Sequence, residues 1–531
     1  MKNAKRSHIF MNGVVRIFAL VLSAGYAAAG PAYPLKLSPG QHYMVDQNGT
    51  PFLVLGASPW YLTELLNGSN ADYYLSVRAS QGYNSIILDI AANGSVEDDS
   101  VPTNIYGQLP FTNIISGHTN LLSWNTSYFT NVDWVINDAS NYGICCFCYP
   151  LYDGYPDNGT PPGGISWYQQ MTGNTTNTLY SYGQFIGNRY KNYPNIVWVG
   201  AGDYNESGAP TTNLWNWLAA GIRSMDTNHL FTAQPQRGTQ AYLEYTNFVN
   251  LEATYPGQFT YDEAKLDYQL SPVLASFDRE PYYEYNATYN FNALNCRQFA
   301  YWAVLYGDTS GQFYGNEHEW PLASGWQTQI VDTVAVTVPN LGKLLNTRLW
   351  YNLVPDFNHT VVTNGYGTDG GSNFVTAARE VSGKTVIAYI PQNDPTITVA
   401  MTNISGSTAT AWWFNPTNAA DTLIGSYRTT GSQTFTPPDS NDWVLVLDDA
   451  SQNYPPPGTP AKVSLGIEAL GGSVYGLTVT GMAGQAYALQ YTTSLNALWQ
   501  ALGSGTIGSS GTTSYSVISL TSNVFFRALN Q

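Results

Sequence analysis

The sequence predicts an α/β protein: a (β/α)8 TIM barrel, then an all-β sandwich domain and a small C-terminal β module. Apolar segments of strand length alternate with helical segments over about 300 residues, which is typical of a parallel sheet covered by helices. About eight strand candidates fit a closed barrel of ordinary size. After Leu349 the helical periodicity stops, and short strands alternate with turns.

The expected barrel elements follow one another in chain order. Residues 31–55 form a β-rich start in which Asn48-Gly49 indicates a hairpin. The strand candidates are Pro51–Gly56, Asn84–Asp89, Cys145–Tyr149, Asn195–Val199, Leu230–Ala233, Phe248–Glu252, Val273–Ser276 and Ser310–Tyr314. The expected helices are Ala71–Gln81, Tyr128–Tyr142, Tyr180–Asn192, Leu214–Met225 and Asn292–Tyr306.

The remaining chain is expected to be β-structure. Its strand candidates are Lys384–Ile390, Thr396–Ala400, Ala411–Phe414 and Trp443–Leu447. The proline-rich run Tyr454–Pro460 indicates a stiff linker. We therefore expect a barrel domain over 31–348, a β-sandwich over 349–450, a linker over 451–460 and a small β domain over 461–531.

The N-terminus indicates export. Four basic residues precede the apolar run Ile17–Leu22, namely Lys2, Lys5, Arg6 and Arg16. Small residues follow the run at Ala27–Gly30. This pattern predicts a signal peptide over residues 1–29, and hence a secreted, periplasmic or cell-surface protein. The alternative is a membrane anchor, but the apolar run is short for a span of about 20 residues. No second transmembrane candidate follows.

Composition excludes two classes of protein. The 531 residues include 20 basic and 36 acidic ones, a net charge of −16. Four basic residues leave with the predicted signal peptide, so 16 remain against 36 acidic ones, a net charge of −20. Such a chain is a poor nucleic-acid binder. An aromatic content of 14% argues against disorder and is common among carbohydrate-active proteins.

The chain offers no recognisable metal or cofactor motif. Cys145, Cys146 and Cys148 share one apolar strand, and their spacing is poor for zinc, so buried thiols are expected. A disulfide from this strand to Cys296 stays open in an oxidising compartment. There is also no phosphate-binding loop and no Gly-x-Ser-x-Gly elbow. We expect no cofactor.

Two acids follow predicted strands at the barrel face where active sites form. Asp203 comes just after the strand Asn195–Val199, and Glu280 follows Val273–Ser276. Two carboxyl groups facing one mouth are what glycosidic bond hydrolysis requires. Helix capping or ion pairing is the structural alternative for each acid. Arg279, Tyr282 and Glu284 lie close to Glu280 in sequence.

Other side chains at predicted strand ends are candidates for sugar binding. Trp60, Tyr314 and Trp320 could stack on a sugar ring or pack in the core. Asp89 and Asn93 could bind hydroxyl groups or cap loops. The further candidates are Glu252, Tyr282, Glu284 and His318, the last as a hydrogen-bonding residue rather than a metal ligand.

Several segments in chain order resemble the apiosidase-like glycoside hydrolase family. They cover most of residues 35–345 and are Pro51–Trp60, Ala71–Asn84, Tyr128–Ile136, Arg189–Asp203, Pro272–Glu284, Arg297–Trp302 and Tyr314–Trp320. The resemblance implies a barrel of the large retaining clan, with Asp203 as general acid/base and Glu280 as nucleophile. Glu284 is the alternative nucleophile, and Glu206 is the alternative acid because Asn205-Glu206 resembles the Asn-Glu pair of related barrel hydrolases.

Residues 349–448 resemble the collagen-binding-type β domain that commonly follows this barrel, which implies a β module packed on the barrel rather than affinity for collagen. The sequence also departs from the family pattern. Ala57–Trp60 replaces an Asp-Thr-Ala-Trp-like turn, and Thr232–Pro235 replaces a Thr-x-His-Pro segment. Asn316 and Glu317 stand where a histidine is usual, and Asn250–Tyr255 also differs.

These changes would line the sugar pocket, so the hydrolase hypothesis does not extend to apiose. We expect a secreted, retaining glycoside hydrolase acting on plant or microbial polysaccharide. The alternative is a non-catalytic glycan-binding or adhesion protein, and a third hypothesis is surface attachment through residues 461–531. The oligomeric state stays open.

Overall fold

The computed structural model describes most of the chain from residue 30 onward. The described ranges are 30–91, 103–154, 167–205, 214–393, 396–471, 474–481, 485–495, 498–507, 512–518 and 524–530. The predicted signal peptide, Asn93 and Glu206 lie outside them. Among the described helices, none combines the length and apolar character needed to cross a bilayer.

Eight parallel strands form the barrel. In chain order they are β4 (Val54–Ala57), β5 (Ser85–Asp89), β8 (Cys145–Tyr149), β9 (Ile196–Ala201), β10 (Phe231–Gln234), β11 (Glu252–Thr254), β12 (Ser276–Asp278) and β13 (Gly311–Tyr314). Their spatial order is β10-β9-β8-β5-β4-β13-β12-β11, so the last strand lies beside the first. The sheet nearly closes between β10 and β11, where the Asn250 amide donates to the Phe231 carbonyl at 2.9 Å. The predicted barrel is confirmed.

Six longer helices surround the strands: α2 (Gly68–Gln81), α3 (Thr126–Asn141), α5 (Thr176–Tyr190), α6 (Leu214–Met225), α8 (Thr260–Tyr268) and α9 (Ala293–Tyr306). Asn67, Asn125 and Asn292 cap three of them by accepting backbone N–H bonds. The shorter helices are α1 (Leu62–Leu65), α4 (Trp167–Thr172), α7 (Ala241–Glu244), α10 (Trp326–Gln329), α11 (Thr333–Thr337) and α12 (Asn340–Leu345).

Helices α5 and α6 pack unusually closely because glycines lie at their contact. A Cβ atom on Gly183 would lie 2.1 Å from the Leu218 carbonyl oxygen. A Cβ atom on Gly221 would lie equally close, 2.1 Å, to the Tyr180 carbonyl oxygen. A larger residue at either position would therefore separate the two helices.

Alternating side chains fill the barrel and its outer layer. Phe147, Phe277 and Phe313 meet inside the barrel with ring centroids 5.0 to 5.8 Å apart. Cys146 and Cys148 flank Phe147 on β8 and point instead into the layer between strands and helices. All four cysteines are buried free thiols. This confirms the prediction for Cys145, Cys146 and Cys148, and the disulfide to Cys296 that was left open is not formed in the structure.

The first β domain has two sheets. One has the order β14-β16-β17-β22-β19-β20 and the other β15-β18-β21. Their bounds are β14 (Leu353–Pro355), β15 (Val362–Asn364), β16 (Thr376–Glu380), β17 (Thr385–Ile390), β18 (Ile397–Ala400), β19 (Thr408–Phe414), β20 (Asp421–Arg428), β21 (Ser432–Phe435) and β22 (Trp443–Asp449). This all-β region was predicted.

The C-terminal module contains two three-stranded sheets, β23-β24-β27 and β26-β25-β28. The strands are β23 (Ser464–Gly471), β24 (Val474–Thr480), β25 (Ala486–Thr492), β26 (Gln500–Thr506), β27 (Thr512–Ile518) and β28 (Phe525–Asn530). Minor sheets near the barrel pair β1 (Lys36–Leu37), β2 (Met44–Val45) and β3 (Pro51–Phe52), and β6 (Ile114–Ile115) with β7 (His118–Thr119). The β2–β3 hairpin contains the predicted Asn48-Gly49 turn.

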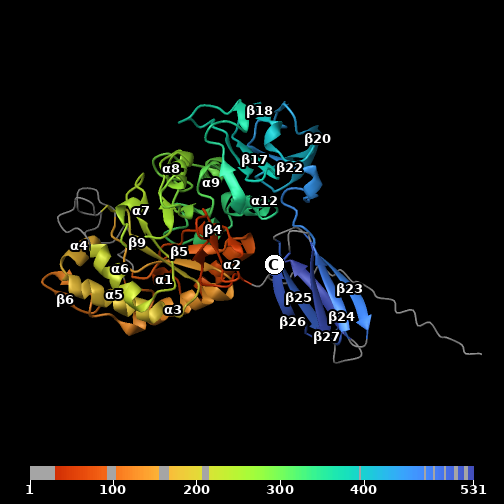
Figure 1. Cartoon of the computed structure of the whole chain (residues 1–531). Helices are drawn as coiled ribbons and strands as arrows, with labels where there is room; N and C mark the ends of the chain where they lie inside the picture. Colours follow the sequence, from red (N-terminus) through yellow and green to blue (C-terminus); the bar gives the residue numbers. More distant parts are fainter. Residues whose placement is uncertain are drawn as a thin grey trace, which may run out of the picture.

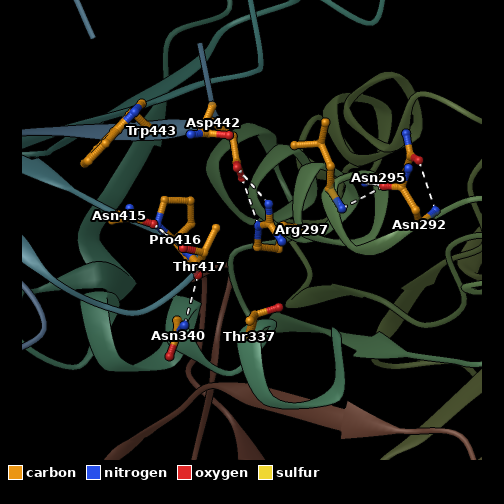
Figure 2. Close-up of polar contacts among 12 residues, drawn as sticks. Asn292, Asn295, Arg297, Thr337, Asn340, Asn415, Pro416, Thr417, Asp442 and Trp443 are labelled. Carbon is orange, nitrogen blue, oxygen red and sulfur yellow. Dashed lines mark hydrogen bonds and ion pairs between the residues drawn. The ribbon is translucent and has the colours of Figure 1, made fainter. Parts of the chain in front are cut away.

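The barrel and the first β domain share a packed interface along α9 and α12 (Figure 1). Arg297 on α9 donates two hydrogen bonds, of 3.0 and 2.8 Å, to the Asp442 carboxylate of the β domain. Asn340 on α12 donates to the Pro416 carbonyl oxygen at 2.9 Å. Figure 2 shows both contacts between the helices and loops of the β domain. The β module therefore packs on the barrel, as the resemblance implies.

Candidate active site

The strand ends bring Asp203 to the carboxyl-terminal face of the barrel. Ala201, Gly202 and Asp203 all have positive φ angles, of 63°, 140° and 56°. Only glycine adopts such angles freely, so this turn is strained at its two other residues, as is common at functional sites. A Cβ atom on Gly202 would lie 2.5 Å from the Tyr152 ring, so the turn needs glycine there.

Gln234 links Asp203 to Glu280. Its Nε2 atom lies 2.8 Å from Asp203 Oδ1 and 2.8 Å from Glu280 Oε2. Because one nitrogen atom bonds to both carboxylate oxygens, the distance between these oxygens is at most twice 2.8 Å. The two acids that the sequence singled out thus lie side by side, although they follow strands β9 and β12.

A buried guanidinium holds Glu280 from the other side. Arg279 Nη2 lies 2.6 Å from Glu280 Oε2, and Nη1 donates to the Tyr149 hydroxyl at 2.5 Å. The Tyr149 hydroxyl donates in turn to Gln234 Oε1 at 2.8 Å. Glu280, Arg279, Tyr149 and Gln234 therefore form a closed ring of hydrogen bonds.

Opposing influences set the ionisation of Glu280. Burial raises the pKa of its carboxyl group, and the nearby Asp203 adds to this effect. The charges of Arg279 and Arg237 lower the pKa, but the net result is a pKa above the ordinary value for glutamate. Burial also raises the pKa of Tyr149 and Tyr152, which keeps both hydroxyl groups protonated as donors near neutral pH.

Aromatic rings line the two carboxyl groups. The Tyr152 hydroxyl donates to Asp203 Oδ2 at 2.6 Å. The Trp60 ring centroid lies 5.1 Å from those of Tyr149 and Tyr152, and its Nε1 donates to the Tyr283 hydroxyl at 2.7 Å. Trp60 is thus placed in the wall of the site, and its role in stacking on a sugar stays a prediction.

A second arginine lies next to Glu280. The Arg237 guanidinium is sandwiched between the rings of Tyr255 and Tyr282, at 4.0 and 4.2 Å from their centroids. It also donates to the Glu280 carbonyl oxygen at 3.2 Å. Tyr282, a predicted substrate-binding residue, therefore lies close to the carboxyl pair, and Arg237 lies between its ring and Glu280.

Glu284 and Tyr314 lie elsewhere. The Tyr314 hydroxyl donates to Glu284 Oε2 at 2.7 Å, in a buried cluster that includes Tyr83 and Cys296. Phe313 takes the inward position on β13, so Tyr314 points outward, between the barrel wall and the helices. The structure therefore does not bring Glu284, the alternative nucleophile, into the hydrogen-bond network of Asp203.

Glu252 and Asp89 form no hydrogen bond with Asp203 or Glu280 in the part of the chain that the structure describes, and a contact of Asp89 with substrate stays a prediction. Both Glu252 oxygens accept backbone N–H bonds at the start of α7, from Ala241 at 2.6 Å and Tyr242 at 2.8 Å. Glu252 thus has the capping role that was the structural alternative. Asp89 is 1% exposed, and burial together with the nearby Glu64 raises its pKa.

His318 and Trp320 lie on the loop after β13. His318 is exposed and its ring stacks on Tyr285, with centroids 4.5 Å apart. Trp320 is half-buried, donates to Glu317 Oε2 at 2.9 Å and lies 5.6 Å from the Tyr61 ring. Their predicted contact with substrate stays a prediction.

Several residues that form the site were not predicted from the sequence: Tyr149, Tyr152, Gln234, Arg237, Tyr255 and Tyr283. Gln234 and Tyr149 are the last residues of β10 and β8, so the strand-end rule would have found them had it been applied beyond acids. Gln234 also lies in the segment Thr232–Pro235 that departs from the family pattern.

The fold and this site define the class of protein. An eight-stranded barrel with two adjacent carboxyl groups at its carboxyl-terminal face has the arrangement that glycosidic hydrolysis requires, and the chain is a glycoside hydrolase. Residues 38–352 match the family model described as "Apiosidase-like, catalytic domain". The chain therefore belongs to the apiosidase-like family, as the sequence motifs indicated.

Further matches agree with the domain architecture. Residues 354–448 match the model "Putative collagen-binding domain of a collagenase". A solved "Glycoside hydrolase" is similar over 80% of this chain and 98% of its own, with 23% identity and a TM-score of 0.67. A glycoside hydrolase family 5 structure from Bacteroides vulgatus covers 79% of this chain and 94% of its own, with 22% identity and a TM-score of 0.67. No curated protein matches the chain.

Proposed function

We propose that the protein is a retaining glycoside hydrolase in which Asp203 is the general acid/base and Glu280 the nucleophile. The shared hydrogen-bond donor Gln234 is the observation that carries this proposal. It limits the separation of two carboxylate oxygens to at most twice 2.8 Å. Retaining enzymes have carboxyl groups about 5–5.5 Å apart, whereas inverting enzymes need about 6.5–9.5 Å to admit a water molecule.

In the first step, Asp203 gives its proton to the glycosidic oxygen while Glu280 attacks the anomeric carbon. The bond to the leaving group breaks, and a glycosyl ester to Glu280 forms. Glu280 Oε2 already accepts bonds from Gln234 and Arg279. Oε1 accepts none from any residue that the structure describes, so we assign the attack to Oε1.

In the second step, the Asp203 carboxylate removes a proton from a water molecule, whose oxygen attacks the anomeric carbon. The ester bond breaks, Glu280 leaves as a carboxylate, and Asp203 is again protonated. The guanidinium of Arg279, 2.6 Å from Glu280, stabilises the carboxylate that departs. The sugar is released with its original anomeric configuration.

The proposed substrate is a plant or microbial polysaccharide met outside the cytoplasm. Support comes from the family, the signal-like N-terminus and the aromatic walls of the site. The segments Ala57–Trp60 and Thr232–Pro235 differ from the family pattern and contribute Trp60 and Gln234 to the site, so the sugar is left unassigned. The alternative of a non-catalytic glycan-binding protein predicts binding without product release.

Aryl glycosides and a polysaccharide panel test the two roles. We expect Asp203→Ala and Glu280→Ala to lower kcat/KM by at least about 10²-fold. Added azide should restore turnover in both variants. It would attack the anomeric carbon in place of the activated water in the Asp203 variant and in place of the carboxylate in the Glu280 variant. The Asp203 variant, used with a good aryl leaving group, should give a glycosyl azide of retained configuration, and the Glu280 variant one of inverted configuration.

Glu284→Gln is the matched carboxyl control, because Glu284 is buried in the outer layer and bonded to Tyr314. It should stay within about twofold of wild type, because the glutamine keeps the shape of the side chain and the Glu284 carboxylate bonds to Tyr314 and Asn316 rather than to Asp203 or Glu280. Full activity of both alanine variants, or inversion by the wild type, would contradict the assignment. Activity lost only in the Glu284 variant would move the nucleophile to that residue.

A further inference from the structure

The orientation of the Gln234 side-chain amide is fixed by the groups around it. Arg279 has no acceptor atom, so its Nη1 must donate to the Tyr149 hydroxyl. That hydroxyl has a single hydrogen, which it gives to the other partner, Gln234. The Gln234 atom facing Tyr149 must therefore be the oxygen, and its NH2 group faces the two carboxyl groups.

Both hydrogens of this NH2 group are then used. One points to Asp203 Oδ1 and the other to Glu280 Oε2, each at 2.8 Å. An oxygen that accepts such a bond cannot also present a proton along it. While the bridge is intact, a neutral Asp203 therefore carries its proton on Oδ2. The Tyr152 hydroxyl, 2.6 Å from Oδ2, donates to the ionised carboxylate and can rotate to accept the proton of the neutral acid.

On the basis of the proposed function, we propose that Gln234 is a positioning residue that selects the reactive oxygen of each carboxyl group. It holds Asp203 Oδ1 and Glu280 Oε2 as acceptors, and this leaves Oδ2 to carry the proton and Oε1 to attack the sugar. Gln234 is fully buried and neutral, so it maintains this geometry without adding a charge between two acids.

Replacing Gln234 should change both rate and pH dependence. Gln234→Leu keeps a similar volume but removes both donors, and we expect kcat/KM to fall by about 10²–10³-fold. Loss of a donor to the Glu280 carboxylate raises its pKa, so the acidic limb of the pH profile should move to higher pH. The groups near Glu280 that could contribute to the pH profile are Arg279, Arg237, Asp203, Asp278, Tyr149, Tyr152, Tyr255 and Tyr283.

Gln234→Glu is the second variant. A neutral glutamate has one hydrogen and can bridge to one carboxyl group only, and its ionised form has none. We expect partial activity at acidic pH and a steep loss as pH rises, with an ionisation absent from the wild-type profile. Gln269→Leu is the matched control, because Gln269 is exposed at the end of α8, and its kcat/KM and pH profile should equal those of wild type.

The outcomes separate the inference from the proposed function. If Asp203→Ala and Glu280→Ala lose activity as expected while Gln234→Leu keeps wild-type kcat/KM and pH limbs, the inference is wrong and the function stands. If both alanine variants stay active, the proposed function fails. Melting temperatures of the Gln234 variants within a few degrees of wild type exclude unfolding as the cause. Should Gln234→Leu not fold, the pH profile of Gln234→Glu decides the inference alone.

Discussion

At the scale of single residues, the ionisation of Glu280 depends on its ion pair with Arg279. Burial raises the pKa of Glu280 and Arg279 lowers it. Arg279→Met would remove the opposing charge and raise this pKa further, so less of the attacking carboxylate would be present at a given pH. We expect the acidic limb of the kcat/KM profile to move to higher pH, and kcat/KM at pH values below the limb to fall by up to about tenfold for each unit that the limb moves.

The deficit of Arg279→Met should shrink as pH rises, because Glu280 then ionises without help. Arg428→Met is a suitable control, since Arg428 is exposed on β20 of the β domain. An unchanged acidic limb in Arg279→Met would show that Arg279 does not support the ionised form of Glu280.

The sequence predicts single residues of this site only in part. Asp203 and Glu280 could be selected because acids at strand ends meet at one barrel face. The direction in which each side chain points could not be predicted, because it depends on the backbone conformation of the loop after each strand. Tyr283 turns toward Trp60 while Glu284 turns toward Tyr314, although the two residues are adjacent. Gln234 was not among the predicted site residues because the search for catalytic groups at strand ends considered acids, and glutamine is neutral.

At the scale of elements, the structure corrects the boundaries of two strands and adds a helix. The expected strand Phe248–Glu252 is instead β11, Glu252–Thr254, because the Phe248 amide closes a turn onto the Tyr245 carbonyl. The expected strand Val273–Ser276 is β12, Ser276–Asp278, and Val273 is 42% exposed. Both expected strands began too early in the sequence, because apolar residues that precede the actual strands were included in them. Helix α8 was not expected because it buries few apolar side chains, such as Tyr261 and Ala264.

These elements enclose an unusual set of buried acids. The Thr254 hydroxyl on β11 contacts Asp267 of α8, and it lies 2.7 Å from Asp308 in the loop before β13. One hydroxyl hydrogen can serve only one carboxylate, so the other acid must supply a proton of its own. Burial raises the pKa of Asp267 to about 7 and raises that of Asp308 as well. The folded protein therefore retains a proton here.

This proton gives a stability prediction with a definite sign. A carboxyl group whose pKa is raised on folding favours the folded state below its unfolded value, about 3.9, and this contribution is lost as pH rises toward about 7. Asp308→Asn would supply a permanent neutral group. We expect its melting temperature to fall less between pH 5 and pH 8 than that of wild type, and to be several degrees higher at pH 8.

Thermal unfolding at both pH values checks this prediction, with Glu468→Gln in the exposed part of β23 as the control. Equal pH dependence in Asp308→Asn and wild type would mean that no proton is held between Asp267 and Asp308.

At the scale of the whole molecule, one apolar cluster extends from the barrel into the first β domain. Trp302 of α9 donates to the Phe374 carbonyl oxygen at 2.8 Å, and the Tyr301 ring stacks on Tyr389 at 4.9 Å. The buried ion pair of Arg348 with Asp448 adds bonds of 2.8 and 2.7 Å. Removing the β domain would take these partners from Arg348 and Arg297 and expose to water the apolar side chains of α9 and α12 that pack against it.

The C-terminal module differs because its apolar cluster contains, among the described residues, only residues of the module itself. Leu477, Val479, Tyr487, Leu489 and Ile507 pack together between its two sheets. The preceding linker, not the module, supplies the Pro455 carbonyl that accepts a hydrogen bond from Arg348 at 2.9 Å. The module is therefore the part of the chain whose loss should disturb the catalytic unit least.

Two truncations test this architecture. A chain ending at Pro460 keeps the linker contacts and should melt within a few degrees of the full chain, with unchanged kcat/KM on small aryl glycosides. A chain ending at Arg348 exposes the apolar side chains of α9 and α12 and should be insoluble or melt far lower. Calorimetry and aryl-glycoside assays on both give the answer. A stable, active chain ending at Arg348 would show that the β domain is dispensable for the barrel, and a destabilised chain ending at Pro460 would assign the module a structural role.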